Sequence, residues 1–90
     1  MTRDPRYSHV KSIWKAGDLD SFSKIFTIVP KSVVSVDMGL NYERFASKLK
    51  KPGRFTFGDI KRMSDLIGMD FEALAHLIFQ EVEKSRRPKD

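Results

Sequence analysis

The chain contains no cysteine, which excludes disulfide bonds and metal sites built on thiolates and fits a reducing cytoplasm. No run approaches the roughly 18 consecutive apolar residues of a membrane-spanning helix, and no signal-peptide pattern follows Met1, so we expect no membrane partner. The two histidines, His9 and His76, lie in separate predicted helices. Because paired carboxylates, a nucleophile–base set and a glycine-rich phosphate loop are also missing, we expect neither a cofactor nor an enzyme.

The size and charge of the chain describe one small basic domain. Ninety residues provide a single modest core, and 40% hydrophobic with 32% charged residues is typical of a globular rather than a disordered chain. The net charge of +5 favours polyanions as partners, nucleic acid before an acidic membrane surface. We therefore expect one domain over 1–90, with loose chain at about 1–6 and in the basic tail 84–90.

Apolar residues recur at helical spacing between these ends and no stretch alternates like a strand, so the sequence predicts an all-α fold. The first predicted helix covers about 7–16 and stops at Gly17. The second is capped by Ser21 and ends before Pro30, which also suits the first turn of the third. The other predicted helices cover 31–38, 42–51, a segment from the Thr56–Asp59 capping box to Gly68, and a segment capped by Asp70.

The predicted helices 31–38 and 42–51 stand out because only three residues separate them. Gly39 is a favourable residue just after a helix, and Asn41 is a favourable N-cap. A turn of this length that contains glycine leaves two helices at the steep angle of a helix-turn-helix. Such a pair needs a small residue where the second backbone approaches the first helix, and Ser35 meets that requirement.

These segments resemble the Cro/phage-repressor (XRE-like) family of helix-turn-helix DNA-binding domains over about 21–74. VVSVDMGLN resembles the family's first helix and turn, YERFASKL its recognition helix, and FTFGDIKRMSDLIGMDFEAL the two helices that follow. The resemblance implies a lambda-repressor-like bundle of about five helices, to which this chain adds an N-terminal helix. One departure is that the family's second core residue in the recognition helix falls at Lys48, whereas this chain has Leu49, four residues after Phe45.

The segment 44–58 contains five cations and no acid. On a helical wheel, Arg44, Lys48 and Lys51 share the side opposite the apolar residues. Like-charged neighbours at this spacing cost a few tenths of a kcal/mol each, so the arrangement contributes nothing to folding. A solvated, solubilising surface is one interpretation. Inside a predicted helix-turn-helix, we favour contact with DNA phosphates.

Helix 42–51 is predicted to enter the major groove of double-stranded DNA with its first turn at the base edges. Glu43 would accept a hydrogen bond from cytosine, Arg44 would donate to guanine, and Ser47 would bond several bases. Tyr42 has two interpretations, because its angle favours the core but its position resembles a base-contact position of the family. The remaining candidates are Lys31, Ser32, Asn41, Lys48, Lys50, Lys51 and Arg54. The lysines and Arg54 among them are expected to contact phosphates.

The function that these patterns favour is sequence-specific DNA binding by a transcriptional regulator. The alternative is a protein-interaction module, antitoxin-like or an adaptor, that keeps the fold without reading DNA. Its motivation is Trp14 in the extra helix, together with Leu66 and Leu77, which lie off the main apolar stripes. These two leucines have two interpretations. Each is covered by a neighbouring helix, which we favour, or each lies at the interface of a homodimer, because members of the resembled family commonly dimerise. The main stripe of the last helix comprises Phe71, Leu74, Ala75, Ile78, Phe79 and Val82.

Overall fold

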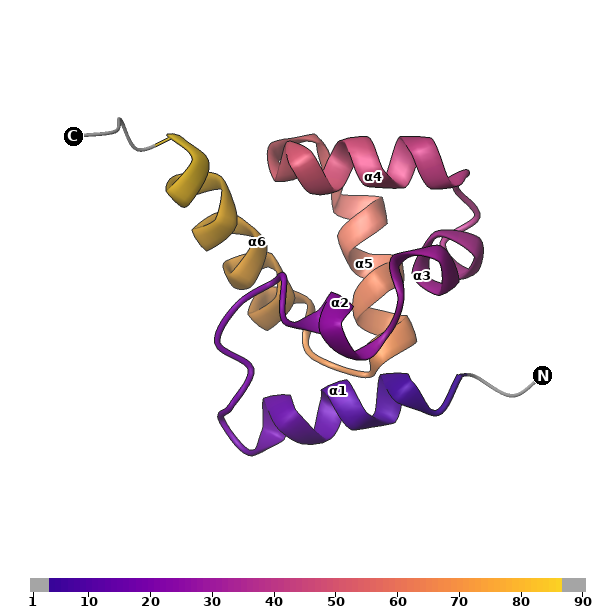
Figure 1. Cartoon of the computed structure of the whole chain (residues 1–90). Coiled ribbons are helices and arrows are strands. Elements are labelled where there is room, and N and C mark those ends of the chain that lie inside the picture. Colours follow the sequence, from indigo (N-terminus) through magenta and orange to yellow (C-terminus); the bar gives the residue numbers. More distant parts are fainter. Residues whose placement is uncertain (1–3, 87–90) are drawn as a thin grey trace.

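The computed structural model describes residues 4–86, with side chains as far as Lys84, and every regular element in that range is helical (Figure 1). The elements are α1 (Arg6–Lys15), α2 (Ile25–Ile28), α3 (Lys31–Asp37), α4 (Tyr42–Lys50), the 3-10 turn η1 (Pro52–Arg54), α5 (Phe57–Ile67) and α6 (Phe71–Arg86). The all-α prediction is confirmed over these residues. α1 packs on α2 and α5, α3 packs on α4, and α6 packs on α5 and η1.

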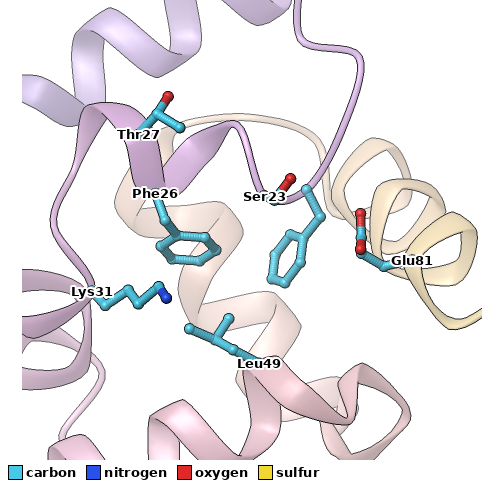
Figure 2. Close-up of a pocket in the computed structure, with 7 residues that line it drawn as sticks. Ser23, Phe26, Thr27, Lys31, Leu49 and Glu81 are labelled. Atoms are coloured by element: carbon cyan, nitrogen blue, oxygen red, sulfur yellow. The ribbon is translucent and has the colours of Figure 1, made fainter. Parts of the chain in front are cut away.

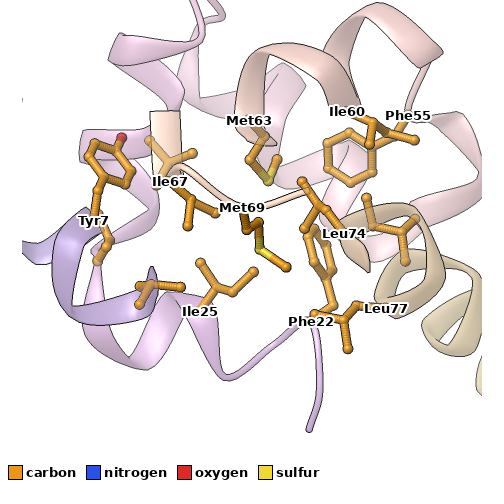
Figure 3. Close-up of a cluster of buried hydrophobic side chains, with 14 of the residues drawn as sticks. Tyr7, Phe22, Ile25, Phe55, Ile60, Met63, Ile67, Met69, Leu74 and Leu77 are labelled. Atoms are coloured by element: carbon orange, nitrogen blue, oxygen red, sulfur yellow. The ribbon is translucent and has the colours of Figure 1, made fainter. Parts of the chain in front are cut away.

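A cluster of buried apolar side chains joins the helices (Figure 3). Four phenylalanines in and beside it form a closed edge-to-face set, with ring centroids 5.3 Å apart for Phe22 and Phe26 and 5.8 Å for Phe26 and Phe45. The other two distances are 6.2 Å from Phe45 to Phe55 and 5.7 Å from Phe55 back to Phe22. Edge-to-face packing sets the positive edge of one ring against the negative face of the next. Because Phe45 belongs to α4 and is fully buried, this set fixes α4 to the core.

The N-terminal helix α1 belongs to the same core. Tyr7 and Val10 are fully buried, and the Tyr7 hydroxyl donates to Asp37 Oδ2 at 2.7 Å, which ties α1 to the last residue of α3. From α5, Arg62 Nη1 donates to the carbonyl of Met38 at 2.9 Å and so satisfies a carbonyl group at the end of α3. Contacts from two other helices therefore hold the end of α3, and with it the turn into α4.

The turn between α3 and α4 depends on Gly39, whose φ is +73°. The N–H of Leu40 donates to the carbonyl of Ser35 at 2.9 Å, and that of Gly39 donates to the carbonyl of Val36 at 3.0 Å, the bond pair of a Schellman motif. A side chain at Gly39 would be strained at this φ, and its Cβ would lie 3.3 Å from a guanidinium nitrogen of α5. The predicted end of the helix at Gly39 is confirmed.

The prediction that Ser21 caps the second helix is wrong. The N–H of Ile25 donates to the carbonyl of Phe22, three residues earlier, and the next two N–H groups repeat this spacing. These tight bonds use the N–H groups that a cap would otherwise satisfy, and α2 is a single α-helical turn without a side-chain cap. Ser21 Oγ instead lies 3.4 Å from Ser23 Oγ. Phe22 and Ile25 are both buried, which shows that the predicted apolar stripe survives the tighter winding.

The apolar face of α6 is centred differently from the prediction. Leu77 is 7% exposed, so cover by neighbouring elements, one of its two interpretations, is confirmed, and Leu66 is half-buried against the core. Phe79, predicted on the main stripe, is 58% exposed. The buried face centres on Leu74 and Ile78, and the next residue lies about 100° further round the helix, beyond the edge of that face.

The basic tail begins later than predicted. α6 continues through Arg86, so loose chain at 84–86 is a wrong prediction. These residues contain no helix breaker, and the next proline is Pro88. The rest of the predicted tail, 87–90, lies outside the described residues. At the other end, 1–3 also lie outside them, and Asp4 accepts from the N–H and the guanidinium of Arg6, where α1 begins.

Candidate nucleic-acid interface

α4 lies along one edge of the molecule, at the opposite end from α1 (Figure 1). Asn41 Oδ1 accepts from the N–H of Arg44 at 2.8 Å, which confirms the predicted N-cap. On the inner side of the helix, Phe45 is fully buried, and Leu40 and Leu49 are half-buried against the core. α4 is therefore held by its inner side, and its outer side faces solvent.

The outer side of α4 and the turn after it present most of the predicted contact residues. The exposed candidates are Asn41, Tyr42, Glu43, Arg44, Ser47, Lys50, Lys51 and Arg54. Tyr42 is 51% exposed, so the core interpretation of this residue is excluded. The side-chain oxygen of Asn41 is already occupied by its capping bond, which leaves its NH₂ group as the free donor.

Ser47 is the central residue of this side, because it lines both of two shallow hollows. The first, of about 310 Å³, is also bordered by Glu43 and Lys50. The second, of about 300 Å³, is bordered by Arg44, Lys48 and Arg54. A short hydroxyl side chain between longer charged ones leaves room for a base edge to approach, and the hydroxyl can both donate and accept.

Four cations on this side are Arg44, Lys50, Lys51 and Arg54. Within residues 4–84, none of their side chains forms an ion pair or a hydrogen bond. A cation without a protein partner breaks no contact when it binds a phosphate, and it releases the counterions of that phosphate. We call these four cations, together with Glu43 and Ser47, the α4 surface.

Lys48 lines the same hollow as Arg44 and Arg54, but it is less exposed than they are and its charge is paired. Its Nζ is 2.6 Å from Asp59 Oδ2, its side chain is 15% exposed, and its ammonium is 6.0 Å from the centroid of the Phe55 ring. The physical reason is that α5 brings a carboxylate to this flank of α4. Lys48 thus occupies the place where the resembled family has a core residue, covering the aromatic ring while its charge is paired.

Asp59 links α4 and α5 through several hydrogen bonds. Its carboxylate accepts from the N–H of Thr56 at 3.0 Å, while Thr56 Oγ1 accepts from the N–H of Asp59 at 3.0 Å, which confirms the predicted capping box. Burial alone would raise the pKa of Asp59. Hydrogen bonds from Lys48 and Thr56 outweigh burial and hold this pKa below its ordinary value of 3.8.

The substitution Asp59→Asn is expected to destabilise the protein at neutral pH by about 1–3 kcal/mol, because it removes the charge partner of Lys48 and weakens the cap. The folded pKa of Asp59 lies below the unfolded value, so this contribution is present above about pH 4 and is lost as the pH falls through the folded pKa. Urea unfolding of wild type and variant should therefore differ at about pH 7 and converge in acid.

The control for this pH experiment is Asp65→Asn. Asp65 pairs with Lys61 at 2.8 Å, but both side chains are more than half exposed, so the pair contributes little. The stability curve of this variant should follow that of wild type at every pH. A difference between Asp59→Asn and wild type that stays constant into acid would show that the carboxylate charge is not what holds α4 to α5.

Lys31 and Ser32, the predicted phosphate contacts at the start of α3, are both exposed. Neither lines the two hollows beside Ser47. Lys31 instead borders a separate pocket beside α2 (Figure 2). The structure therefore brings nine of the eleven candidates together on or beside the outer side of α4, Lys48 among them with its charge paired, and it separates Lys31 and Ser32 from them.

The sequence-based reasoning did not single out Phe57, which is 81% exposed at the start of α5. Its ring centroid lies 6.3 Å from that of Phe71. The sequence contained a signal for this exposure, because Phe57 precedes the buried positions Ile60, Met63 and Ile67 by spacings that leave it at the edge of their stripe.

Within the described part of the chain, no group of three or more His, Asp or Glu side chains could hold a metal ion. No helix in that part is both long and apolar enough to cross a bilayer. Comparisons with protein-family models, with curated proteins and with solved structures find no match for this chain. Its function is therefore inferred from its own residues and their geometry.

Proposed function

We propose that the chain is a sequence-specific DNA-binding protein and a transcriptional regulator, with α3, the turn at Gly39 and α4 as its helix-turn-helix. The observation that carries this proposal is the α4 surface. Four cations without protein partners surround a serine and a glutamate on a helix whose other side is buried. Repulsion among these cations contributes nothing to folding, whereas a phosphate backbone would neutralise them.

The size of α4 suits the major groove. Its nine residues span about 13.5 Å, and the groove is about 12 Å wide. With the first turn at the base edges, Glu43 and Arg44 read cytosine and guanine, and Ser47 adds a hydroxyl contact. Lys50, Lys51 and Arg54 then meet phosphates on either side. Lys48 orients α4 through Asp59 and makes no phosphate contact in this arrangement.

Binding to mixed-sequence duplex DNA is expected to weaken steeply with salt. Three phosphate contacts per chain correspond to a slope of about −2.7 in a plot of log affinity against log salt, or about a fortyfold loss between roughly 50 and 200 mM. Fluorescence anisotropy of a labelled duplex measures this slope. A folded protein that shows no binding at about 50 mM salt would refute the proposal.

Arg44→Ala and Lys51→Ala should affect binding differently. Arg44→Ala removes the guanine contact, so it should reduce the binding free energy by about 1–3 kcal/mol at preferred sites and reduce discrimination between sites. Lys51→Ala removes a phosphate contact, so it should weaken binding to all sequences alike and make the salt slope less negative by about 0.9. The control is Lys15→Ala on α1, at the other end of the molecule (Figure 1). Equal losses across all sites for both variants would contradict these roles.

The protein-interaction alternative draws on different residues in the structure. Trp14 is half-buried against the core and Leu77 is buried, so neither presents the open surface that motivated this alternative. The exposed ring of Phe57 beside Phe71, and that of Phe79 on α6, now favour it instead. This second function would be supported if the folded protein does not bind DNA but binds a protein partner, and if the Phe57→Ser variant no longer binds that partner.

A further inference from the structure

A pocket of about 360 Å³ opens beside α2, α3, α4 and α6 (Figure 2), and none of its lining residues belongs to the α4 surface. This volume falls at the lower end of the range for small-molecule sites. Its lining combines three apolar side chains with four polar ones: Phe22, Phe26, Leu49, Ser23, Thr27, Lys31 and Glu81. Phe22 is buried, and Phe26 and Leu49 are half-buried, so they form an apolar wall that a ligand can cover.

Two opposite charges border this pocket. Lys31 and Glu81 extend toward it from opposite sides in Figure 2. Within the described residues, the Lys31 ammonium has no ion pair or hydrogen bond, whereas Glu81 Oε1 has Lys84 Nζ at 3.9 Å. The hydroxyl of Thr27 already donates to the carbonyl of Lys24 at 2.6 Å. The charge beside the apolar wall that has no partner in that part of the chain is therefore the Lys31 ammonium, which favours an anionic ligand.

We propose that this pocket binds a small aromatic carboxylate. The ring packs against Phe22, Phe26 and Leu49, where edge-to-face contacts with the phenylalanines extend the aromatic set of the core. The carboxylate accepts a charge-assisted hydrogen bond from Lys31. Glu81 repels a carboxylate on its own side, which fixes the orientation of the ligand. This site differs from the DNA-binding surface, and its occupancy can be measured without DNA.

Phenylacetate is the probe for this site, and its neutral analogue phenylacetamide isolates the contribution of the charge. In ¹⁵N-labelled full-length protein, phenylacetate should give saturable shifts in the amides of 22–29, of Lys31 and of Leu49. Phenylacetamide should bind several-fold more weakly, because its neutral carbonyl oxygen accepts a weaker hydrogen bond from the Lys31 ammonium than a carboxylate does. Acetate, which has no ring, should produce no saturable shifts in these amides.

Two variants with opposite expected effects test the two charges. Lys31→Met should weaken phenylacetate binding by about tenfold or more, while Glu81→Gln should strengthen it a few-fold. Lys15→Met, which makes the same charge change on α1, should leave the affinity unchanged, and retained dispersion of the amide spectrum shows that each variant is folded. The proposal is overturned if phenylacetamide binds as well as phenylacetate, if phenethylamine binds in its place, or if no probe saturates.

Discussion

Phe45→Ala is expected to lower the free energy of unfolding by about 3–5 kcal/mol, the usual cost of deleting a buried aromatic ring. Phe45 is fully buried and lies between Phe26 and Phe55 in the edge-to-face set, so its loss removes two ring contacts and leaves a cavity beneath α4. The total free energy of unfolding of a small domain is only about 5–15 kcal/mol. The variant should therefore unfold at a much lower urea concentration, as followed by circular dichroism.

Tyr42→Ala is the control for this experiment. It removes another aromatic ring from the same helix, but one that is half exposed. Its effect on the free energy of unfolding should stay below about 1 kcal/mol, as is usual for surface positions. Equal destabilisation by the two substitutions would mean that the set of four phenylalanines is not what holds α4 in place.

Helix ends were predictable because the signals act over a few residues. Asn41 caps α4 and the Thr56–Asp59 pair caps α5 through bonds three residues apart, and Gly39 ends α3 through its own φ. Such features depend on local backbone geometry, so the amino-acid order specifies them almost alone. Ser21 shows the limit of this reasoning. A good cap residue was present, but the burial of Phe22 and Ile25 was compatible with a tighter turn that needs no cap.

The environment of Lys48 could not be predicted from periodicity. A helical wheel places Lys48 four residues from Arg44, at the edge of the polar side, but it does not say which element covers that edge. The partner, Asp59, is eleven residues away and reaches Lys48 only because η1 turns the chain and α5 packs below α4. A charge pattern therefore identified the helix that bears the candidate site, while the tertiary packing determined which of its cations remain free.

The boundaries of the core were likewise determined by tertiary packing rather than by the periodicity of the sequence. The side of α6 that is buried depends on which parts of the chain pack against it, and in the folded protein Leu77 lies beside Phe22 (Figure 3) and is buried, while Phe79 is exposed. The pocket that Lys31 borders could not be predicted from a local pattern either, because its lining residues come from α2, α3, α4 and α6 and from the segment before α2. Long-range contacts thus account for the differences between the predicted and observed surfaces, both at α4 and at α6.

The double substitution Arg44→Glu/Lys51→Glu is expected to reduce DNA affinity by at least about 100-fold at about 0.1 M salt. It removes one base contact and one phosphate contact and places two negative charges against the backbone, with each reversal costing about 1.4 kcal/mol or more. Both side chains are exposed and without partners, so the free energy of unfolding should change little. Anisotropy titration against one preferred site, with circular dichroism as a check of folding, measures both effects.

Net charge alone would also weaken DNA binding, and this contribution must be separated from that of the α4 surface. Lys11→Glu/Lys15→Glu changes the net charge of the protein by the same amount, but both residues are on α1, at the far end from α4 (Figure 1). If α4 enters the groove, this variant should lose only a few-fold in affinity, because charges more than about 10 Å from a phosphate are largely screened at 0.1 M salt. Equal losses in the two variants would mean that the basic domain attracts DNA without presenting α4 to it.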